Sequence, residues 1–334
     1  MPSVTTSDVR RIRDAVFFEG AARHRKLSRF WVLLLLAGTI ATAGVIADST
    51  ATVIGAMIVA PLMVPILGAV FAIAIGSRAN LVRSVVLVAL GAAAVVALAY
   101  LIGALTPIDV LAPSNTQVAG RVNPRFIDFI AALATGAVGA FALVRDDVAD
   151  TLPGVAIAIS LVPPLAVVGL TLEAGAGDQA RGALLLFLTN VAAILVTGVA
   201  VMAAYRVRQA SRAVALEDAD GADGPAIRSR YPVLLVVLLA AVIVVPLITA
   251  SRRLTAGALA TDRVSRVAEE WVHDTGWQIV QVQYLDGRVV IRALGPLPSP
   301  SPEDLRRRLD RVGEAGTDVA LELVPEERVE LPGR

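Results

Sequence analysis

Uncharged windows, separated by short charged segments, fill the first three quarters of the chain. They cover residues 30–47, 49–77, 84–108, 129–144, 151–172, 182–205 and 231–250. A membrane-spanning helix needs about 20 mostly apolar residues. Six of the windows are near or above that length, and the fourth reaches it if its helix starts near Phe126 and includes Asp128. The pattern therefore predicts an α-helical polytopic membrane protein with seven spans.

Residues 262–334 follow a different pattern, with charged residues throughout. Val264 and Trp271 keep helical spacing, and two alternating segments then flank Asp286-Gly287, a typical hairpin turn. A proline-rich stretch precedes a helical segment around Leu305 and a last alternating segment. The pattern predicts a small αββαβ C-terminal domain. Its bare three-stranded sheet has edges that favour pairing in an oligomer.

Basic residues near the span ends indicate the orientation, because short segments rich in Lys and Arg stay in the cytoplasm. Fifteen of them lie before the first span and in the second-to-third, fourth-to-fifth and sixth-to-seventh connections, against three in the opposite loops. We therefore expect the amino terminus in the cytoplasm. Seven spans then place the C-terminal domain outside, although Arg252 and Arg253 nearly balance Arg228 and Arg230 around the last span.

Two polar segments lie on the cytoplasmic side of this scheme. Residues 1–29 are basic and predict an interfacial helix in which Val16, Phe17 and Phe18 touch lipid. The alternative is a topology signal and nothing more. Residues 206–230 mix both signs of charge with glycine, which predicts a flexible, solvated linker before the seventh span, 231–250.

Comparison of the chain with itself reveals an internal repeat. A shift of 99 residues superimposes the first three windows on the fourth, fifth and sixth. The same shift aligns Gly55 with Gly154, Ile58 with Ile157, Leu62 with Leu161 and Pro65 with Pro164. Each unit holds three spans, and an odd number makes the second unit enter the membrane from the opposite side. Residues 30–205 therefore predict a 3+3 inverted-repeat core.

The middle span of each unit carries two prolines, Pro61 and Pro65 in the first and Pro163 and Pro164 in the second. Proline inside a helix removes a backbone donor and costs about 3 kcal/mol or more. We therefore expect broken second and fifth helices whose freed carbonyls face protein or water rather than lipid. Paired breaks of this kind form the binding site in secondary transporters. The alternative is a pair of kinked helices that only shape the bundle.

Four segments resemble the signature segments of the domain-of-unknown-function 389 family. They are STATVIGAMIVAPLMVPILG (49–68), NPRFIDFIAALATGAVGAFAL (123–143), LPGVAIAISLVPPLAVVGL (152–170) and GALLLFLTNVAAI (182–194). The resemblance covers about residues 30–205. It implies a multi-pass protein of a bacterial or archaeal cell membrane, and it implies no established substrate or reaction.

Polar residues in or beside the spans are the remaining candidates for an ion or solute path. Asp128 is an intramembrane carboxylate, but Asn123-Pro124 favours a helix start that puts Asp128 in the first turn. Asn190, in the sixth span, either lines the path or bonds to a neighbouring helix. On the broken helices the candidates are Ser49, Thr50, Thr52, Gly55 and Ser160. The hydroxyls can instead bond to their own helix, and Asp48 is expected to cap the helix that follows it.

Composition and charge restrict the chemistry. The chain is 56% hydrophobic and 18% charged, with a mean hydropathy of +0.71, which excludes an ordinary soluble protein. The 30 Lys and Arg nearly balance the 29 Asp and Glu, so we expect no nucleic-acid partner. The chain has no cysteine, two histidines outside the spans and no catalytic motif. We therefore expect no enzyme activity, no cofactor and no metal site.

These features favour a homo-oligomeric transporter or channel for a small ion or polar solute, embedded in the lipid bilayer. Its site is expected between the break at Pro61 and Pro65 and the break at Pro163 and Pro164. The other hypothesis is a non-transporting membrane scaffold or envelope sensor whose C-terminal domain binds a partner.

Overall fold

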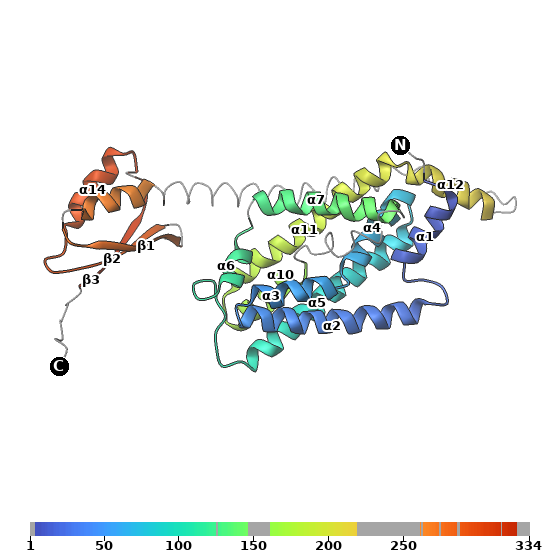
Figure 1. The fold of residues 1–334 in the computed structure, drawn as a ribbon, viewed down its shortest axis with the longest axis horizontal. Coiled ribbons are helices and arrows are strands. Elements are labelled where there is room, and N and C mark those ends of the chain that lie inside the picture. Colours follow the sequence, from blue (N-terminus) through green and yellow to red (C-terminus); the bar gives the residue numbers. More distant parts are fainter. Residues whose placement is uncertain are drawn as a thin grey trace, which may run out of the picture. The chain divides into compact units, whose positions relative to one another are not determined.

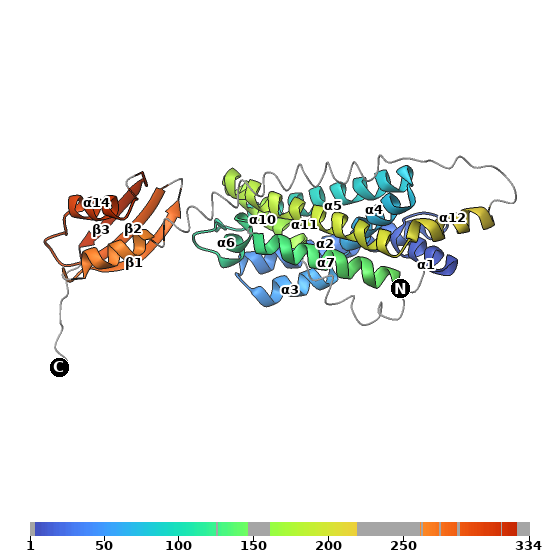
Figure 2. The same cartoon turned by 90° about the horizontal axis from the view of Figure 1, so that it is seen from above.

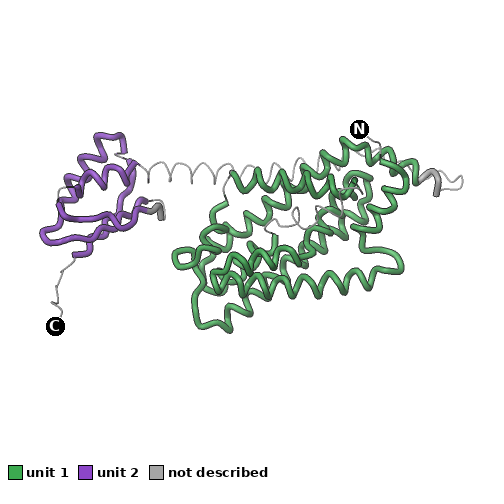
Figure 3. Tube along the Cα trace, viewed as in Figure 1, with its two compact units in different colours: residues 1–248 green, residues 249–334 purple. Residues whose placement is uncertain are grey.

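The computed structural model describes residues 4–124, 126–145, 161–218, 261, 263–273, 275–285, 288–314 and 316–325. The chain divides into two compact units, residues 1–248 and residues 249–334 (Figure 3). The predicted seventh span, 231–250, lies outside the described residues, as do 219–230 of the predicted linker.

The described part of the first unit is helical (Figure 1). Its helices are α1 (Thr6–Val16), α2 (Arg23–Ile46), α3 (Thr50–Val59), α4 (Met63–Ile75), α5 (Arg78–Ala104), α6 (Thr116–Val122), α7 (Phe126–Val144), α10 (Val162–Glu173), α11 (Gly177–Ala204) and α12 (Val207–Asp218). Within the described residues, α2, α5, α7 and α11 are long and apolar enough to cross a membrane. The pair α3 and α4 forms a fifth candidate span, bent by 47°. The number and apolarity of these helices therefore confirm the prediction of an α-helical polytopic membrane protein.

The half helices α4 and α10 pack between the long helices. Helix α10 lies against α5 and α11, and α4 lies against the same two helices (Figures 1 and 2). The long helices pair in turn, α2 with α5 and α7 with α11. Every residue of α10 from Val162 to Thr171 is buried. Such all-round burial explains why its sequence lacks a polar face.

Helices α4 and α10 end in the same way. Gly76 and Gly175 follow them with φ of 80° and 72°, a left-handed conformation that glycine adopts without strain. After each glycine, a backbone N–H returns to the helix: Ser77 N donates to Ala72 O and Ala176 N to Thr171 O, both at 2.8 Å. Helices α5 and α11 begin two residues beyond these glycines.

Helix α1 packs its apolar side on the protein. Its residues Val9, Ile12 and Val16 are buried, and Phe17 stacks on Phe71 of α4 with 5.4 Å between ring centroids. The predicted lipid contact of Val16 and Phe17 is therefore wrong. An amphipathic helix needs an apolar surface to cover, and here α4 supplies it.

Helix α12 occupies the first half of the segment predicted as a flexible linker. Val207 and Val214 are buried, and the helix contacts α1, α4 and α11. The prediction of a solvated linker is therefore wrong for residues 207–218. The buried valines recur at helical spacing, which gives the helix one apolar side.

The second unit has its own core and the predicted αββαβ order. A helix over residues 263–272 precedes β1 (Gln278–Leu285), β2 (Arg288–Gly295), α14 (Pro302–Arg311) and β3 (Val319–Pro325). Strand β2 lies in the middle, antiparallel to β1 and parallel to β3. Two indole N–H groups are satisfied at the core edge, Trp271 by Ser301 O at 3.1 Å and Trp277 by Pro296 O at 2.6 Å.

Candidate functional site

The break between α3 and α4 spans residues 60–62, and two prolines produce it. Pro61 has no N–H to donate to Met57 O, so α3 ends with the bond from Ala60 N to Ala56 O at 3.1 Å. Pro65 has no N–H to donate to Pro61 O, which accepts from Val64 N at 3.2 Å instead. The predicted break in the second span is therefore confirmed, and Pro65 is buried in the first turn of α4.

Pro163 and Pro164 lie in the first turn of α10, at the second and third positions after the N-cap Leu161, and both are buried. Proline is well tolerated there, because the first N–H groups of a helix have no partner within it. Within the described residues the two prolines thus begin a helix rather than interrupt one. The predicted preceding half, residues 152–160 with Ser160, lies outside the described residues.

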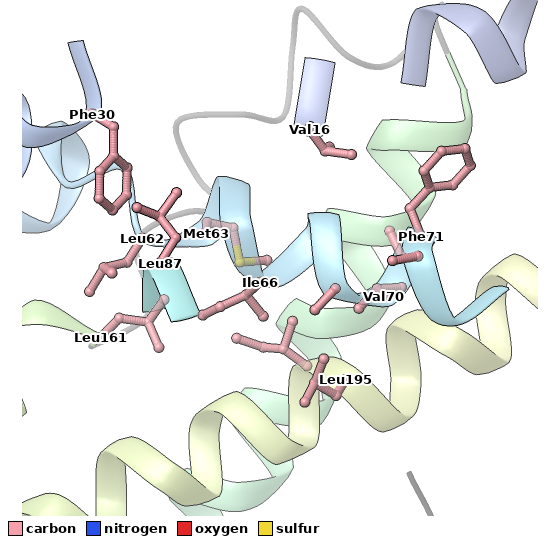
Figure 4. Close-up of a cluster of buried hydrophobic side chains, with 14 of the residues drawn as sticks. Val16, Phe30, Leu62, Met63, Ile66, Val70, Phe71, Leu87, Leu161 and Leu195 are labelled. Carbon is pink, nitrogen blue, oxygen red and sulfur yellow. The ribbon is translucent and has the colours of Figure 1, made fainter. Parts of the chain in front are cut away.

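The two helix starts meet in one buried cluster. Leu62, from the α3–α4 break, and Leu161, at the start of α10, are 0% and 5% exposed and belong to the same apolar cluster (Figure 4). Met63, Ile66 and Val162 join them. Leu62 and Leu161, at the edges of the two proline-containing segments, thus belong to one buried cluster. The described side chains of this cluster are apolar.

Two polar side chains are buried in the middle of α11. Thr189 is 1% exposed and Asn190 is 2% exposed. Within the described residues, Thr189 Oγ1 has no hydrogen-bond partner. Buried hydroxyls are normally paired. Thr189 therefore offers an available hydrogen-bonding group inside the helical core.

The hydroxyls predicted to line a path lie at the other end of α3 and anchor it. Ser49 is the N-cap of α3, and its Oγ pairs with Thr52 Oγ1 at 2.9 Å. Thr50 Oγ1 accepts from Gln117 Nε2 of α6 at 2.8 Å. Ser49 and Thr52 thus bond within their own helix, whereas Thr50 bonds to another helix, and the structure brings none of the three to the break.

Asp48 caps a different helix from the one predicted. Its carboxylate accepts from Thr116 Oγ1 at 2.7 Å and from Gln117 N at 3.0 Å, in the first turn of α6. The hydrogen bond from Thr116 lowers the pKa of Asp48. The prediction that Asp48 caps the following helix α3 is wrong, because Ser49 takes that position.

Asp128 and Gly55 are not at the breaks either. Asp128 is half-buried in the first turn of α7, as predicted. Asn123 is the C-cap of α6 and α7 begins at Phe126, so the predicted N-cap is wrong. Gly55 lies on the exposed side of α3 with no atom near the position of a Cβ.

A pocket of about 430 Å³ opens beside the α3–α4 break. The break forms one wall, and the start of α2 and the segment after α1 form the others. Lys26 holds these walls together, because its Nζ donates to Asp14 O at 2.5 Å and to Phe17 O at 3.1 Å. Sequence reasoning missed this pocket. In the sequence, Lys26 and Arg29 indicate only the orientation of the first span. Their position just before that span is the one signal that could have pointed to the pocket.

Comparison with known proteins agrees with the resemblance seen in the sequence. Residues 57–196 match a family described as a domain of unknown function (DUF389). An uncharacterized protein of the archaeon Methanocaldococcus jannaschii is 33% identical over 174 residues, which are 52% of this chain and 53% of that protein. The chain thus spans about half the length of the relative it matches. No solved structure matches the chain. The match to the DUF389 family thus covers the segment of residues 57–196, which runs from α3 into α11.

Proposed function

We propose that the chain is a transporter or channel that passes a small ion or polar solute between the two proline-containing segments. The core of this proposal is a 3+3 inverted repeat, with α2 to α5 as one unit and α7 to α11 as the other. Assembly into a homo-oligomer and residence in a bacterial or archaeal cell membrane belong to the same proposal.

Helix boundaries support the repeat. A shift of 99 residues carries Met63, the first residue of α4, to Val162, the first residue of α10. The same shift carries Gly76, which ends α4, to Gly175 and the start of α5 to the start of α11. The starts of both helices and the glycine of the turn between them thus agree to the residue.

Contacts between the units support a two-fold relation. The position of a Cβ on Gly198 is 2.8 Å from Val70 Cγ2, and that of a Cβ on Gly169 is 2.6 Å from Ala99 Cβ. The shift of 99 residues pairs Val70 with Gly169 and Ala99 with Gly198. Replacing each residue by its counterpart in the other unit therefore converts the contact between Val70 and Gly198 into the contact between Gly169 and Ala99. A two-fold axis between the units produces such a pair of equivalent contacts.

Helix directions support inversion. The start of α2 meets the segment after α1 through Lys26, which donates to Phe17 O. The end of α7 meets α1, because Arg11 Nη2 donates to Val144 O at 3.4 Å. The first helix of one unit therefore starts where the first helix of the other ends.

The breaks supply the features of a substrate site. The N-termini of α4 and α10 carry partial positive charge and meet in the cluster of Leu62 and Leu161. Asn190 is the repeat counterpart of Gly91, whose Cβ position is 3.2 Å from Leu62 Cδ2. On the proposed two-fold relation, the buried amide of Asn190 is expected beside Leu161, the counterpart of Leu62. Apolar side chains that close such a point act as a hydrophobic gate.

The observation that carries the proposal is the meeting of Leu62 and Leu161 in one buried cluster. We expect purified protein in liposomes to pass at least one solute from a panel of Na⁺, K⁺, chloride, phosphate and small amino acids, above the rate of empty liposomes. Passage of none, with correctly inserted protein, would overturn the proposal.

The second candidate function is a scaffold or envelope sensor. It is favoured by the separate hydrophobic core of the C-terminal unit and by its two sheet edges, β1 and β3. Removal of residues 262–334 separates the two hypotheses. A transporter keeps its solute flux, whereas a sensor loses its cellular function although its helical core stays folded.

A further inference from the structure

The pocket beside the α3–α4 break combines apolar walls with a basic rim. Phe30 and Leu33 of α2 line one side of it, and Ile58 and Val59 at the end of α3 line another, together with Pro61 of the break. Ile58 and Val59 remain 57% and 39% exposed, so no described part of the protein covers this wall. A volume of about 430 Å³ falls within the range of about 300–1,000 Å³ that is typical of ligand pockets.

Three charged residues line the pocket where α2 begins. Lys26 uses two of its three N–H donors on the carbonyls of Asp14 and Phe17, and one remains. Arg29 is exposed, and within the described residues its guanidinium makes no ion pair or hydrogen bond. Asp14 contributes the one negative charge of the lining. The two cations outweigh it, so the rim is positive.

We propose that this pocket binds an anionic phospholipid, with the phosphate at Arg29 and Lys26 and an acyl chain along Leu33 and Val59. The proposal goes beyond solute passage. A cationic rim above apolar walls complements a molecule with an anionic head and an apolar tail, and basic pockets between membrane helices bind such headgroups. A free anion would leave the apolar walls uncovered, and a zwitterionic lipid such as phosphatidylcholine would bring its own ammonium group to the positive rim.

Binding at this place has a structural consequence. The acyl chain would lie between α2 and the break, against Pro61, where the 47° bend occurs. Lipid composition would then bias how far α3 and α4 can straighten. The break and the bilayer are coupled through this pocket.

The test compares lipid retention by the full chain, extracted from membranes that contain phosphatidylglycerol and phosphatidylcholine and examined by native mass spectrometry. We expect wild type to retain phosphatidylglycerol in preference to phosphatidylcholine. Arg29→Gln should lower the apparent affinity for phosphatidylglycerol about tenfold, the effect of one lost charge-assisted hydrogen bond. Arg29→Lys should retain most of the binding.

Two control variants show whether the effect on lipid retention is specific to the pocket. Arg78→Gln removes a charge from an exposed arginine that does not line the pocket, and it should leave retention unchanged. Val59→Trp should fill the pocket and displace the lipid, whereas Val32→Trp, on the exposed side of α2, should not. Equal retention of both lipids by wild type, or equal loss from Arg29→Gln and Arg78→Gln, would overturn the proposal. So would retention of phosphatidylglycerol by Val59→Trp.

Discussion

Alanine in place of Gly169 is expected to destabilise the helical core by about 1–3 kcal/mol, the usual cost of overpacking. The added Cβ would collide with Val96 O and would lie 2.8 Å from Tyr100 N. Both are backbone atoms of α5, so no side-chain rotation relieves the contact. Helices α10 and α5 would have to separate, which removes contact along the fully buried α10.

Two matched glycines test this explanation by thermal unfolding of the purified protein. Gly198→Ala meets only the side chain of Val70, the counterpart contact, and should destabilise less than Gly169→Ala. Gly55→Ala meets nothing and lies inside α3, so it should stabilise the protein by about 0.5–1 kcal/mol. A melting temperature for Gly169→Ala at or above that of wild type would contradict the packing of α10 on α5.

The double replacement of Pro61 and Pro65 by alanine is expected to abolish solute flux without unfolding the protein. Alanine at residue 61 restores an N–H that can donate to Met57 O. Alanine at residue 65 restores an N–H that can donate to the carbonyl of residue 61. Continuous helix through residues 50–75 then becomes favourable, because each interior proline costs about 3 kcal/mol. Straightening of the 47° bend would move Leu62 away from Leu161 and destroy the paired break.

Flux into liposomes, measured at equal protein insertion, checks this second prediction. The double variant should fall to the rate of empty liposomes while its helical content is equal to or higher than that of wild type. Pro107→Ala, in the exposed loop after α5, is the matched control and should transport normally. Normal flux from the double variant would mean that the breaks only shape the bundle.

The positions of the long apolar helices α2, α5, α7 and α11 were predictable from the sequence, because length and apolarity alone identify helices that can span a membrane. The break at Pro61 was predictable for an equally local reason, the missing proline N–H. The repeat was visible in the sequence as a shift of 99 residues, and the same shift separates the first residue of α4 from the first residue of α10. Local rules of this kind need no knowledge of neighbours.

Features that depend on a tertiary partner were not predictable in the same way. The apolar face of α1 fits lipid and protein equally well, and only the presence of Phe71 decides that Phe17 packs inward. Asp48 caps α6, which begins 68 residues later in the chain, rather than α3. Lys26 and Arg29 looked like topology signals because a pocket between α2 and the break is invisible in a linear sequence.

The inverted repeat is tested most directly by the sides of the membrane on which the two units begin. The chain has no cysteine, so single cysteines can be introduced without background. Arg25→Cys marks the start of α2. Gly120→Cys marks an exposed position of α6, just before α7. In sealed oriented vesicles, a membrane-impermeant thiol reagent should label these two cysteines from opposite sides, and both should react in detergent. Labelling of both from the same side would contradict the inverted repeat.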